Sequence, residues 1–292
     1  MKPFLSVLIP TYNRADMTIE CAKSVGDNPD VEIVIVDDCS NDTEFAKLLD
    51  ADIPNAKLYR NDANLGMTKN FNRCMELASG DWFGLIGSDD YYKPGAIDRA
   101  INALHCLPPC LMVYARSTKA RLLQPGVETV RNMKLPSGSG NFWHRSIYED
   151  LGGFDERLTF SPDLEYWYRI ASKYPVAESR EKFSVYREHG NNLMYDTWRK
   201  RDEFLRHIKL ITRLNMVHRG EDVTDLDAVV ANESKAVWDV IVYIIGVVAK
   251  KPDKKDIYWM YMEKAKSMAF TRDRIDTVER LRNKHGEDNI SV

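Results

Sequence analysis

Short apolar segments that end in polar turns recur through the first part of the chain, and helical patterns separate them. The clearest is Val31–Val36, which is nearly all apolar and β-branched, as in a parallel strand buried on both faces. The run Trp82–Ile86 is likewise too short for a buried helix. Strands that alternate with helices at this spacing form βαβ crossovers. The sequence therefore predicts an α/β fold with a mainly parallel sheet flanked by helices.

Local start and stop signals give the expected bounds of these elements. Gly26 ends the first helix, Ser79–Gly80 caps the third, and Pro94 and Pro162 each fit a first helical position. The expected strands are residues 4–9, 31–36, 57–59, 82–86, 111–114 and 183–187, and the expected helices end at residues 25, 49, 78 and 104, with a further one beginning at 161–163.

Three of the predicted strands end in polar turns, namely Thr11–Arg14, Asp37–Asp38 and Ser88–Asp90. In parallel sheets, ligands bind outside the carboxyl ends of the strands, so we expect these turns to line one crevice. An acidic pair directly after a buried strand is unfavourable unless a positive group lies beside it. We interpret that group as a divalent metal that carries a diphosphate.

Composition excludes several other classes of protein. The formal net charge of −3 gives no overall attraction to nucleic acid, so none is predicted as a partner. The five cysteines are scattered and form no C-x-x-C pair, which argues against a disulfide framework or a zinc site and favours a reducing cytoplasm. No cleavable signal peptide is expected at the N-terminus. The longest apolar run, Val237–Ala249, contains Asp239 and is shorter than the roughly 20 residues of a spanning helix.

Glycine and proline become rare after about residue 196, and the chain then resembles a set of helices. We therefore predict a catalytic domain over 1–195 and a helical C-terminal region over 196–292. This region would pack on the first domain, form a homo-oligomer, or contact the acceptor or the membrane. Basic clusters such as Trp198–Arg201 allow a peripheral contact with the inner face of an anionic membrane.

Several motifs occur in the same order as in one known family. They are Ser6–Arg14, Glu32–Thr43, Asn64–Gly66, Ala78–Trp82, Ser88–Asp90, Gly152–Asp155 and Tyr186–His189. Together they resemble glycosyltransferase family 2, the inverting nucleotide-sugar transferases of the GT-A fold, over about two thirds of the chain. The helical region after residue 196 is not covered by this resemblance.

The resemblance implies roles for individual residues. Asp37 would accept a hydrogen bond from the base ring, most often uracil, and Asp163 would be the catalytic base. Asp89 would bind Mn²⁺ or Mg²⁺, and His189 would reach the metal or the diphosphate. The further residues expected around the nucleotide sugar are Pro10, Thr11, Tyr12, Arg14, Asn70, Ser88, Asp89 and Asp90.

One position departs from the family pattern, because Gly87 stands where the Asp-x-Asp motif has its first aspartate. Hard oxygen ligands suit Mg²⁺ or Mn²⁺, which keep waters and phosphate oxygens in their shell, so Asp89 with His189 is a sufficient minimum. Neighbouring side chains on extended backbone point in opposite directions. We therefore expect Asp90 to hold the turn or to meet the donor sugar.

Two predictions rest on less specific features. Trp143 and His144 lie in an aromatic and basic patch, which could grip the acceptor sugar or serve packing alone. For Asp163, the helix dipole would lower proton affinity, whereas burial beside Tyr166 and Trp167 would raise it. The sequence leaves both alternatives open.

The function that fits these observations is a metal-dependent inverting glycosyltransferase of the hexosyl- or hexosaminyltransferase class. It would move a sugar from a nucleotide-diphosphate donor, most often a UDP-sugar, to a glycan or lipid-linked acceptor in polysaccharide biosynthesis. The alternatives are a degenerate sugar-binding homologue, for which Gly87 is the main hint, and a sugar nucleotidyltransferase. The latter needs a glycine-rich basic loop after the first strand, which Pro10–Tyr12 does not supply.

Overall fold

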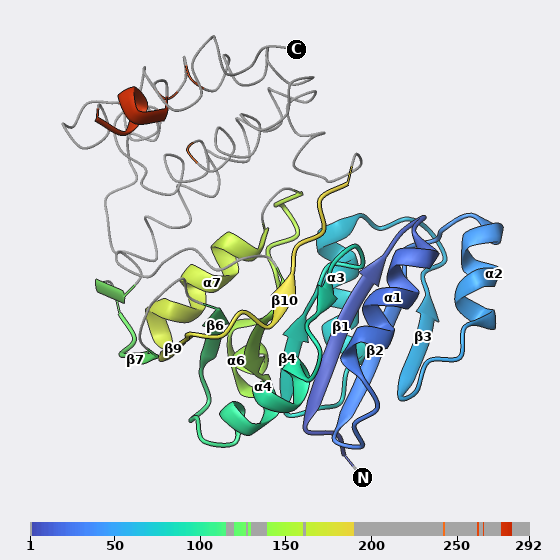
Figure 1. Ribbon diagram of the computed structural model, residues 1–292, viewed down its shortest axis with the longest axis horizontal. Coiled ribbons are helices and arrows are strands. Elements are labelled where there is room, and N and C mark those ends of the chain that lie inside the picture. Colours follow the sequence, from blue (N-terminus) through green and yellow to red (C-terminus); the bar gives the residue numbers. More distant parts are fainter. Residues whose placement is uncertain are drawn as a thin grey trace. The chain divides into compact units, whose positions relative to one another are not determined.

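A twisted sheet forms the core of the N-terminal part of the chain in the computed structural model (Figure 1). The structure describes residues 2–114, 120–126, 128–129, 139–159 and 162–189, with 242, 262, 265 and 276–281. Within these residues the sheet has eight strands in the order β3-β2-β1-β4-β8-β6-β9-β7. The predicted α/β fold with a mainly parallel sheet flanked by helices is confirmed.

Most strands of the sheet run in one direction, and two run against it. The parallel strands are β1 (Leu5–Thr11), β2 (Val31–Asp37), β3 (Ala56–Arg60), β4 (Trp82–Leu85), β6 (Leu111–Tyr114) and β9 (Val176–Ser179). The antiparallel strands are β8 (Asn141–His144) and β7 (Arg121–Leu123), and a separate small sheet pairs β5 (Tyr91–Tyr92) with β10 (Ser184–Val185).

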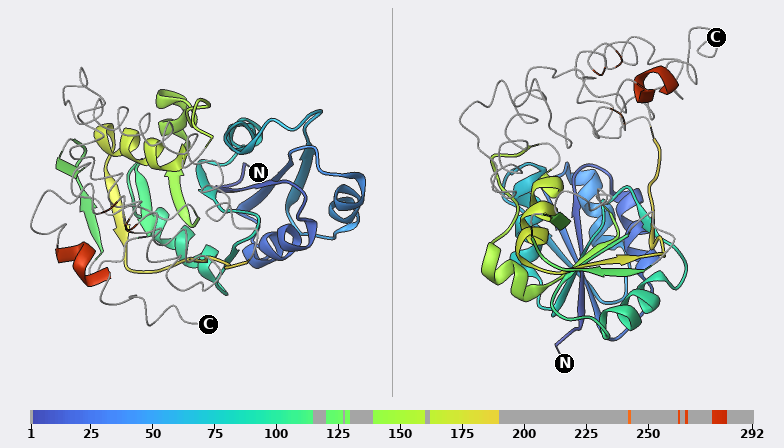
Figure 2. Two further views of the ribbon diagram at one scale, coloured as in Figure 1. Left: turned by 90° about the horizontal axis from the view of Figure 1, so that it is seen from above. Right: turned by 90° about the vertical axis from the view of Figure 1, so that its left-hand side faces the viewer.

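Helices cover both faces of the sheet, as the right-hand view of Figure 2 shows. Their bounds are α1 (Ala15–Val25), α2 (Asp42–Asp50), α3 (Met67–Leu77), α4 (Ala96–Leu104), α6 (Arg145–Leu151) and α7 (Pro162–Lys173). The crossovers through α1 and α2 step outward from β1 to β3, whereas α3 leads back past β2 and β1 to β4. Because crossovers are right-handed, α3 lies on the opposite face from α1 and α2.

The register of the central strands brings three chemically important residues to the same level. Thr11 pairs with Asp37, and Asp37 pairs with Arg60, at the last positions of β1, β2 and β3. The neighbouring strand β4 runs parallel to β1, so the chain that follows it emerges at the same edge. Polar residues from four strand ends are thereby gathered at the carboxyl edge of the sheet.

The sequence did not predict β8, which lies antiparallel between β4 and β6. Its residues Asn141–Trp143 are buried, so the segment lacks the alternation that marks a half-exposed strand. No helix among the described residues is long and apolar enough to cross a membrane. The boundary at 195 and most of the predicted helices after residue 196 lie outside these residues and stay predictions.

A buried carboxylate fixes the amino edge of the sheet. Glu32 in β2 is only 4% exposed. Its Oε1 accepts hydrogen bonds from Ser6 Oγ at 2.6 Å and Ser79 Oγ at 2.8 Å, and its Oε2 accepts one from Lys57 Nζ at 2.7 Å. Gly80 N–H also donates to Glu32 Oε1, at 3.1 Å. One side chain therefore joins β1, β2, β3 and the turn before β4.

We predict that Glu32→Gln lowers the free energy of unfolding by about 2 kcal/mol at pH 7, because a charged acceptor of several hydrogen bonds is lost. Burial opposes ionisation of Glu32, but the hydrogen bonds from Lys57, Ser6 and Ser79 outweigh it and lower its pKa to about 2. The stabilisation is thus complete above the ordinary pKa of 4.5 and is lost as the pH falls toward about 2.

Urea unfolding at several pH values measures this difference between the wild type and the variant. Glu76→Gln is the matched control, since Glu76 is half-exposed and pairs with Arg73 on the surface of α3. We expect it to change stability by less than about 0.5 kcal/mol. An equal loss in both variants would contradict the role of Glu32.

Candidate functional site

The loops after β1 and β2 are joined by hydrogen bonds at the carboxyl edge of the sheet. Asn13 N–H donates to Ser40 Oγ at 2.7 Å, and Asn41 N–H donates to Asn13 Oδ1 at 2.9 Å. Asn13 and Cys39 have φ values of +50° and +61°, in the left-handed region that non-glycine residues rarely adopt. Such backbone conformations cluster at ligand sites, where the surrounding structure enforces them.

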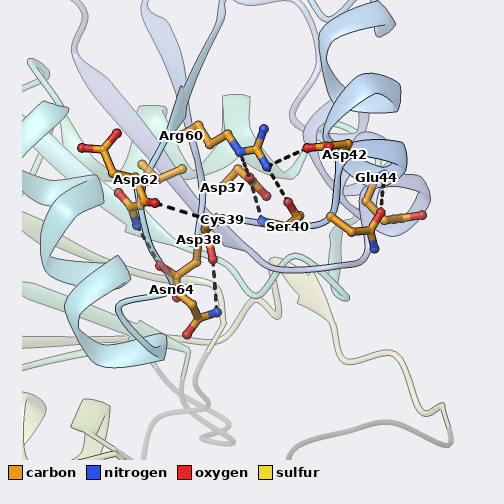
Figure 3. Close-up of polar contacts among 12 residues, drawn as sticks. Asp37, Asp38, Cys39, Ser40, Asp42, Glu44, Arg60, Asp62 and Asn64 are labelled. Atoms are coloured by element: carbon orange, nitrogen blue, oxygen red, sulfur yellow. Dashed lines mark hydrogen bonds and ion pairs between the residues drawn. The ribbon is translucent and has the colours of Figure 1, made fainter.

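Asp37 is fully buried at this edge and offers one unsatisfied oxygen (Figure 3). Its Oδ2 accepts a hydrogen bond from Ser40 N–H at 3.0 Å and lies 3.4 Å from Arg60 Nε. Its Oδ1 has no hydrogen-bond partner within the described part of the chain. A buried acceptor without a donor is unfavourable, so this oxygen fits a hydrogen-bond donor supplied by a ligand.

Arg60, which the sequence analysis did not single out, closes the same corner of the site. Its guanidinium donates to Ser40 O at 2.6 Å and lies 4.3 Å from the ring centroid of Phe45. The sequence does place Arg60 directly after the predicted third strand, residues 57–59. Because parallel strands share a carboxyl edge, this position indicates that Arg60 lies at the same edge as Asp37. Arg60 thereby holds the loop that carries Asp37 and Ser40 (Figure 3).

Asp38 organises the loop before α3 rather than facing the crevice. Its Oδ1 accepts from Asn61 Nδ2 and Leu65 N–H, each at 2.8 Å, and its Oδ2 accepts from Gly66 N–H at 2.9 Å. Asn70 belongs to the same network, because it donates to Val36 O and accepts from Asn61, both at 2.9 Å. Asn70 is buried, and both ends of its amide contact the protein, so its role toward the donor stays a prediction.

Asp89 and Arg14 form an ion pair between the loops that follow β4 and β1. Arg14 Nη1 lies 2.6 Å from Asp89 Oδ2, and their side chains are 32% and 18% exposed. Tyr12 is 46% exposed between the two strand ends. The other residues predicted from this motif are less accessible: Pro10, Thr11 and Ser88 are buried, and Thr11 hydrogen-bonds Thr18 at 2.6 Å.

Asp90 holds the turn through hydrogen bonds to the protein. Its Oδ1 accepts from Arg187 N–H at 3.0 Å, and its Oδ2 accepts from Ser139 Oγ, which in turn accepts from Gly87 N–H at 3.0 Å. Burial raises the pKa of Asp90 to about 6, although these hydrogen bonds act in the opposite direction. Of the two roles expected for Asp90, the structure supports holding the turn.

Gly87 leaves the space that Asp89 occupies. A Cβ atom at this position would lie 2.8 Å from Asp89 Oδ1, which is closer than real Cβ contacts. An aspartate at position 87 would therefore force Asp89 out of its present position. The departure from the Asp-x-Asp pattern is consistent with a site built around Asp89 alone.

Asp163 lies in the first turn of α7, which precedes β9. A helix that leads into a parallel strand starts at the carboxyl edge of the sheet, so topology places Asp163 at the edge that holds Asp89. A hydrogen bond from Thr68 Oγ1 to Leu158 O also ties the preceding segment to the first turn of α3. Burial raises the pKa of Asp163 to about 6, so desolvation outweighs the helix dipole.

The structure does not bring the other predicted residues to this edge. His144 pairs with Trp82 at the start of β4, so it lies at the amino edge of the sheet, because β8 runs antiparallel to β4. Trp143 is fully buried. This placement corrects the acceptor role that the aromatic patch suggested. The position of His189, the last residue before a gap in the described chain, relative to Asp89 stays a prediction.

The crevice fits a divalent cation only as an incomplete site. In the described part of the chain, no three His, Cys, Asp or Glu side chains converge on one point. However, Asp89 already holds a positive group, the guanidinium of Arg14. A single carboxylate suits Mg²⁺ or Mn²⁺, which take most remaining ligands from water and substrate phosphates.

Comparison with known sequences agrees with this geometry. Residues 6–146 match the sequence model described as Glycosyl transferase family 2. The chain is also 26% identical, over 262 residues, to the uncharacterized glycosyltransferase YwdF of Bacillus subtilis, a match that covers 80% of this chain and 95% of YwdF.

Two solved structures share the fold at low sequence identity. The structure of TarS of S. aureus, residues 1–349 in complex with UDP-GlcNAc, superimposes with a TM-score of 0.60 at 15% identity. The match covers 98% of this chain and 92% of the TarS chain. The mannosyltransferase PcManGT of Pyrobaculum calidifontis was solved with GDP-Man and Mn²⁺ and has a TM-score of 0.54 at 16% identity. The match covers 99% of this chain and 88% of PcManGT.

We predict that Asp38→Ala loosens the loop over residues 61–66. Removing the carboxylate leaves Leu65 N–H and Gly66 N–H without their acceptor, which costs about 2 kcal/mol. Hydrogen–deuterium exchange should become faster in this loop, and the free energy of unfolding should fall by a similar amount. Asp42→Ala is the control, because the Asp42 side chain is fully exposed. Unchanged exchange at 61–66 would contradict the assignment.

Proposed function

Because this chain is a glycosyltransferase whose residues 6–146 belong to glycosyl transferase family 2, we propose that it is a metal-dependent inverting enzyme that uses a UDP-sugar. The acceptor would be a hydroxyl group of a glycan or a lipid-linked saccharide. The observation that carries the proposal is the convergence of Asp37, Arg14 and Asp89 at one edge of the sheet. These groups suit a base, a diphosphate and a cation, respectively.

The unpartnered oxygen of Asp37 supports a uracil base. Uracil presents one ring N–H, at N3, and a buried carboxylate oxygen is a strong acceptor for such a donor. TarS was solved with UDP-GlcNAc, which is consistent with this choice. Guanine also presents a ring N–H, and PcManGT was solved with GDP-Man, so GDP is the competing donor nucleotide.

The leaving diphosphate requires positive charge. Arg14 would donate to its oxygens, and an Mn²⁺ or Mg²⁺ ion bound at Asp89 would supply further charge neutralisation. The manganese in the PcManGT complex supports this choice of cofactor. Asp90 holds the turn through its hydrogen bonds to Ser139 and Arg187, and its contact with the donor sugar stays a prediction.

Asp163 would act as the general base. A carboxylate oxygen of Asp163 takes the proton of the acceptor hydroxyl, whose oxygen forms a bond to the anomeric carbon as the bond from that carbon to the diphosphate breaks. Attack from the face opposite the leaving group inverts the anomeric centre. The raised pKa of about 6 makes Asp163 a stronger base than an ordinary aspartate while leaving it ionised at pH 7.

We expect Asp37→Ala to weaken UDP binding by about 10- to 100-fold, because a charge-assisted hydrogen bond to the base is lost. Isothermal titration calorimetry with UDP and Mn²⁺ measures the change, and Asp37→Asn tests the charge while keeping the shape. Asp62→Ala, on the exposed neighbouring loop, should bind UDP as the wild type does. Wild-type affinity in Asp37→Ala would remove the base-binding assignment.

We expect Asp163→Asn to lower kcat by about 100- to 10,000-fold without changing UDP affinity. In the wild type, kcat should rise with pH through about 6, since the base acts only when ionised. UDP release from a panel of UDP-sugars, with glycan and lipid-linked acceptors, measures both effects. Asp150→Asn is the surface control. A kcat that does not depend on pH between about 5 and 7 would contradict this role.

A further inference from the structure

The Arg14–Asp89 pair occupies the position that the proposed function needs for a cation. Arg14 lies in the loop after β1 and is the N-cap residue of α1, and Asp89 lies in the loop after β4. Because β1 and β4 are paired parallel neighbours, the two loops meet at the same edge. The sheet therefore brings the two side chains within reach of each other, and Arg14 Nη1 lies 2.6 Å from Asp89 Oδ2.

This contact is less exposed to solvent than a typical surface ion pair. The Asp89 side chain is only 18% exposed, and a guanidinium–carboxylate hydrogen bond is charge-assisted. Asp90 is less available to a cation than Asp89, because it is buried and both of its oxygens already accept hydrogen bonds from the protein. Asp89 is thus the carboxylate for which two positive groups compete.

Asp89 cannot hold the guanidinium and a divalent cation at contact distance on the same oxygen, since the two positive charges would repel each other. A cation that binds Asp89 Oδ2 would therefore displace the guanidinium, which then needs another anion nearby. A diphosphate supplies one, because the planar fork of arginine matches two phosphate oxygens. Binding of the diphosphate and of the cation would therefore favour each other.

We infer that Arg14 couples the two binding events: it occupies Asp89 while the crevice is empty and transfers to the diphosphate when a nucleotide and a cation enter together. Arg14 is in this view a positioning residue that keeps Asp89 from binding a cation alone. The inference rests on the proposed function and adds that the cation binds together with the nucleotide, not before it. It also predicts that one variant, Arg14→Gln, binds Mn²⁺ more tightly and UDP more weakly than the wild type.

The test uses Mn²⁺ and UDP as probes with the full chain. The electron paramagnetic resonance signal of free Mn²⁺ reports its affinity without UDP and with saturating UDP. In Arg14→Gln we expect Mn²⁺ alone to bind about fivefold more tightly than in the wild type, because its competitor is gone. UDP should then bind more weakly, and the gain in Mn²⁺ affinity on adding UDP should shrink.

Three variants separate this effect from general changes in charge or folding. Lys23→Gln removes one positive charge from the exposed side of the same helix and should leave Mn²⁺ affinity unchanged. Arg14→Lys keeps the charge and should lie between the wild type and Arg14→Gln. Asp89→Asn should lose Mn²⁺ binding both with and without UDP. Circular dichroism melting confirms that each variant is folded.

The outcomes distinguish the inference from the function on which it rests. If the wild type shows UDP-dependent Mn²⁺ binding but Arg14→Gln binds Mn²⁺ alone no more tightly than the wild type, the coupling role is overturned and the proposed function stands. If the wild type binds neither UDP nor Mn²⁺, the proposed function itself fails. Equal tightening in Lys23→Gln also overturns the inference, because the effect would then be long-range electrostatics.

Discussion

The arrangement of the strand ends depends on the hydrogen bonds that the carboxylate of Glu32 accepts. This carboxylate joins β1, β3 and the turn before β4 to β2 at the amino edge of the sheet. A shift by one residue would turn every side chain of a strand to the other face. Fixing the register at this edge therefore fixes it at the other, where Thr11, Asp37 and Arg60 lie at one level.

The carboxylates of the crevice are chemically alike, but their partners give them different roles. Asp38 and Asp90 are bound by several protein donors and hold loops. Among the described residues, Asp37 keeps one buried oxygen without a hydrogen-bond partner, whereas Asp89 faces a guanidinium that another anion can attract. These last two are therefore placed to respond to a ligand. Burial and hydrogen bonding, rather than residue type, separate binding aspartates from structural ones.

The aromatic core beneath α7 explains the properties of Asp163. Trp143 packs against Tyr166 and Trp167, with ring centroids 6.0 and 5.3 Å apart, and so anchors the helix that starts beside Asp163. The segment 141–144 thus contributes through packing of α7 instead of through contact with an acceptor. The apolar surroundings of the helix also account for the raised pKa of Asp163, because they penalise its charged form.

The sequence by itself determined the alternation of strands and helices, the parallel core of the sheet and the edge at which Thr11, Asp37 and Asp89 meet. These features follow from local hydrophobic patterns and from the rule that parallel strands share a carboxyl edge. Tertiary structure alone decided the insertion of β8, the pairing of Arg14 with Asp89, and the link from Gly87 through Ser139 to Asp90. These depend on contacts between segments far apart in the chain, and no local pattern encodes such contacts.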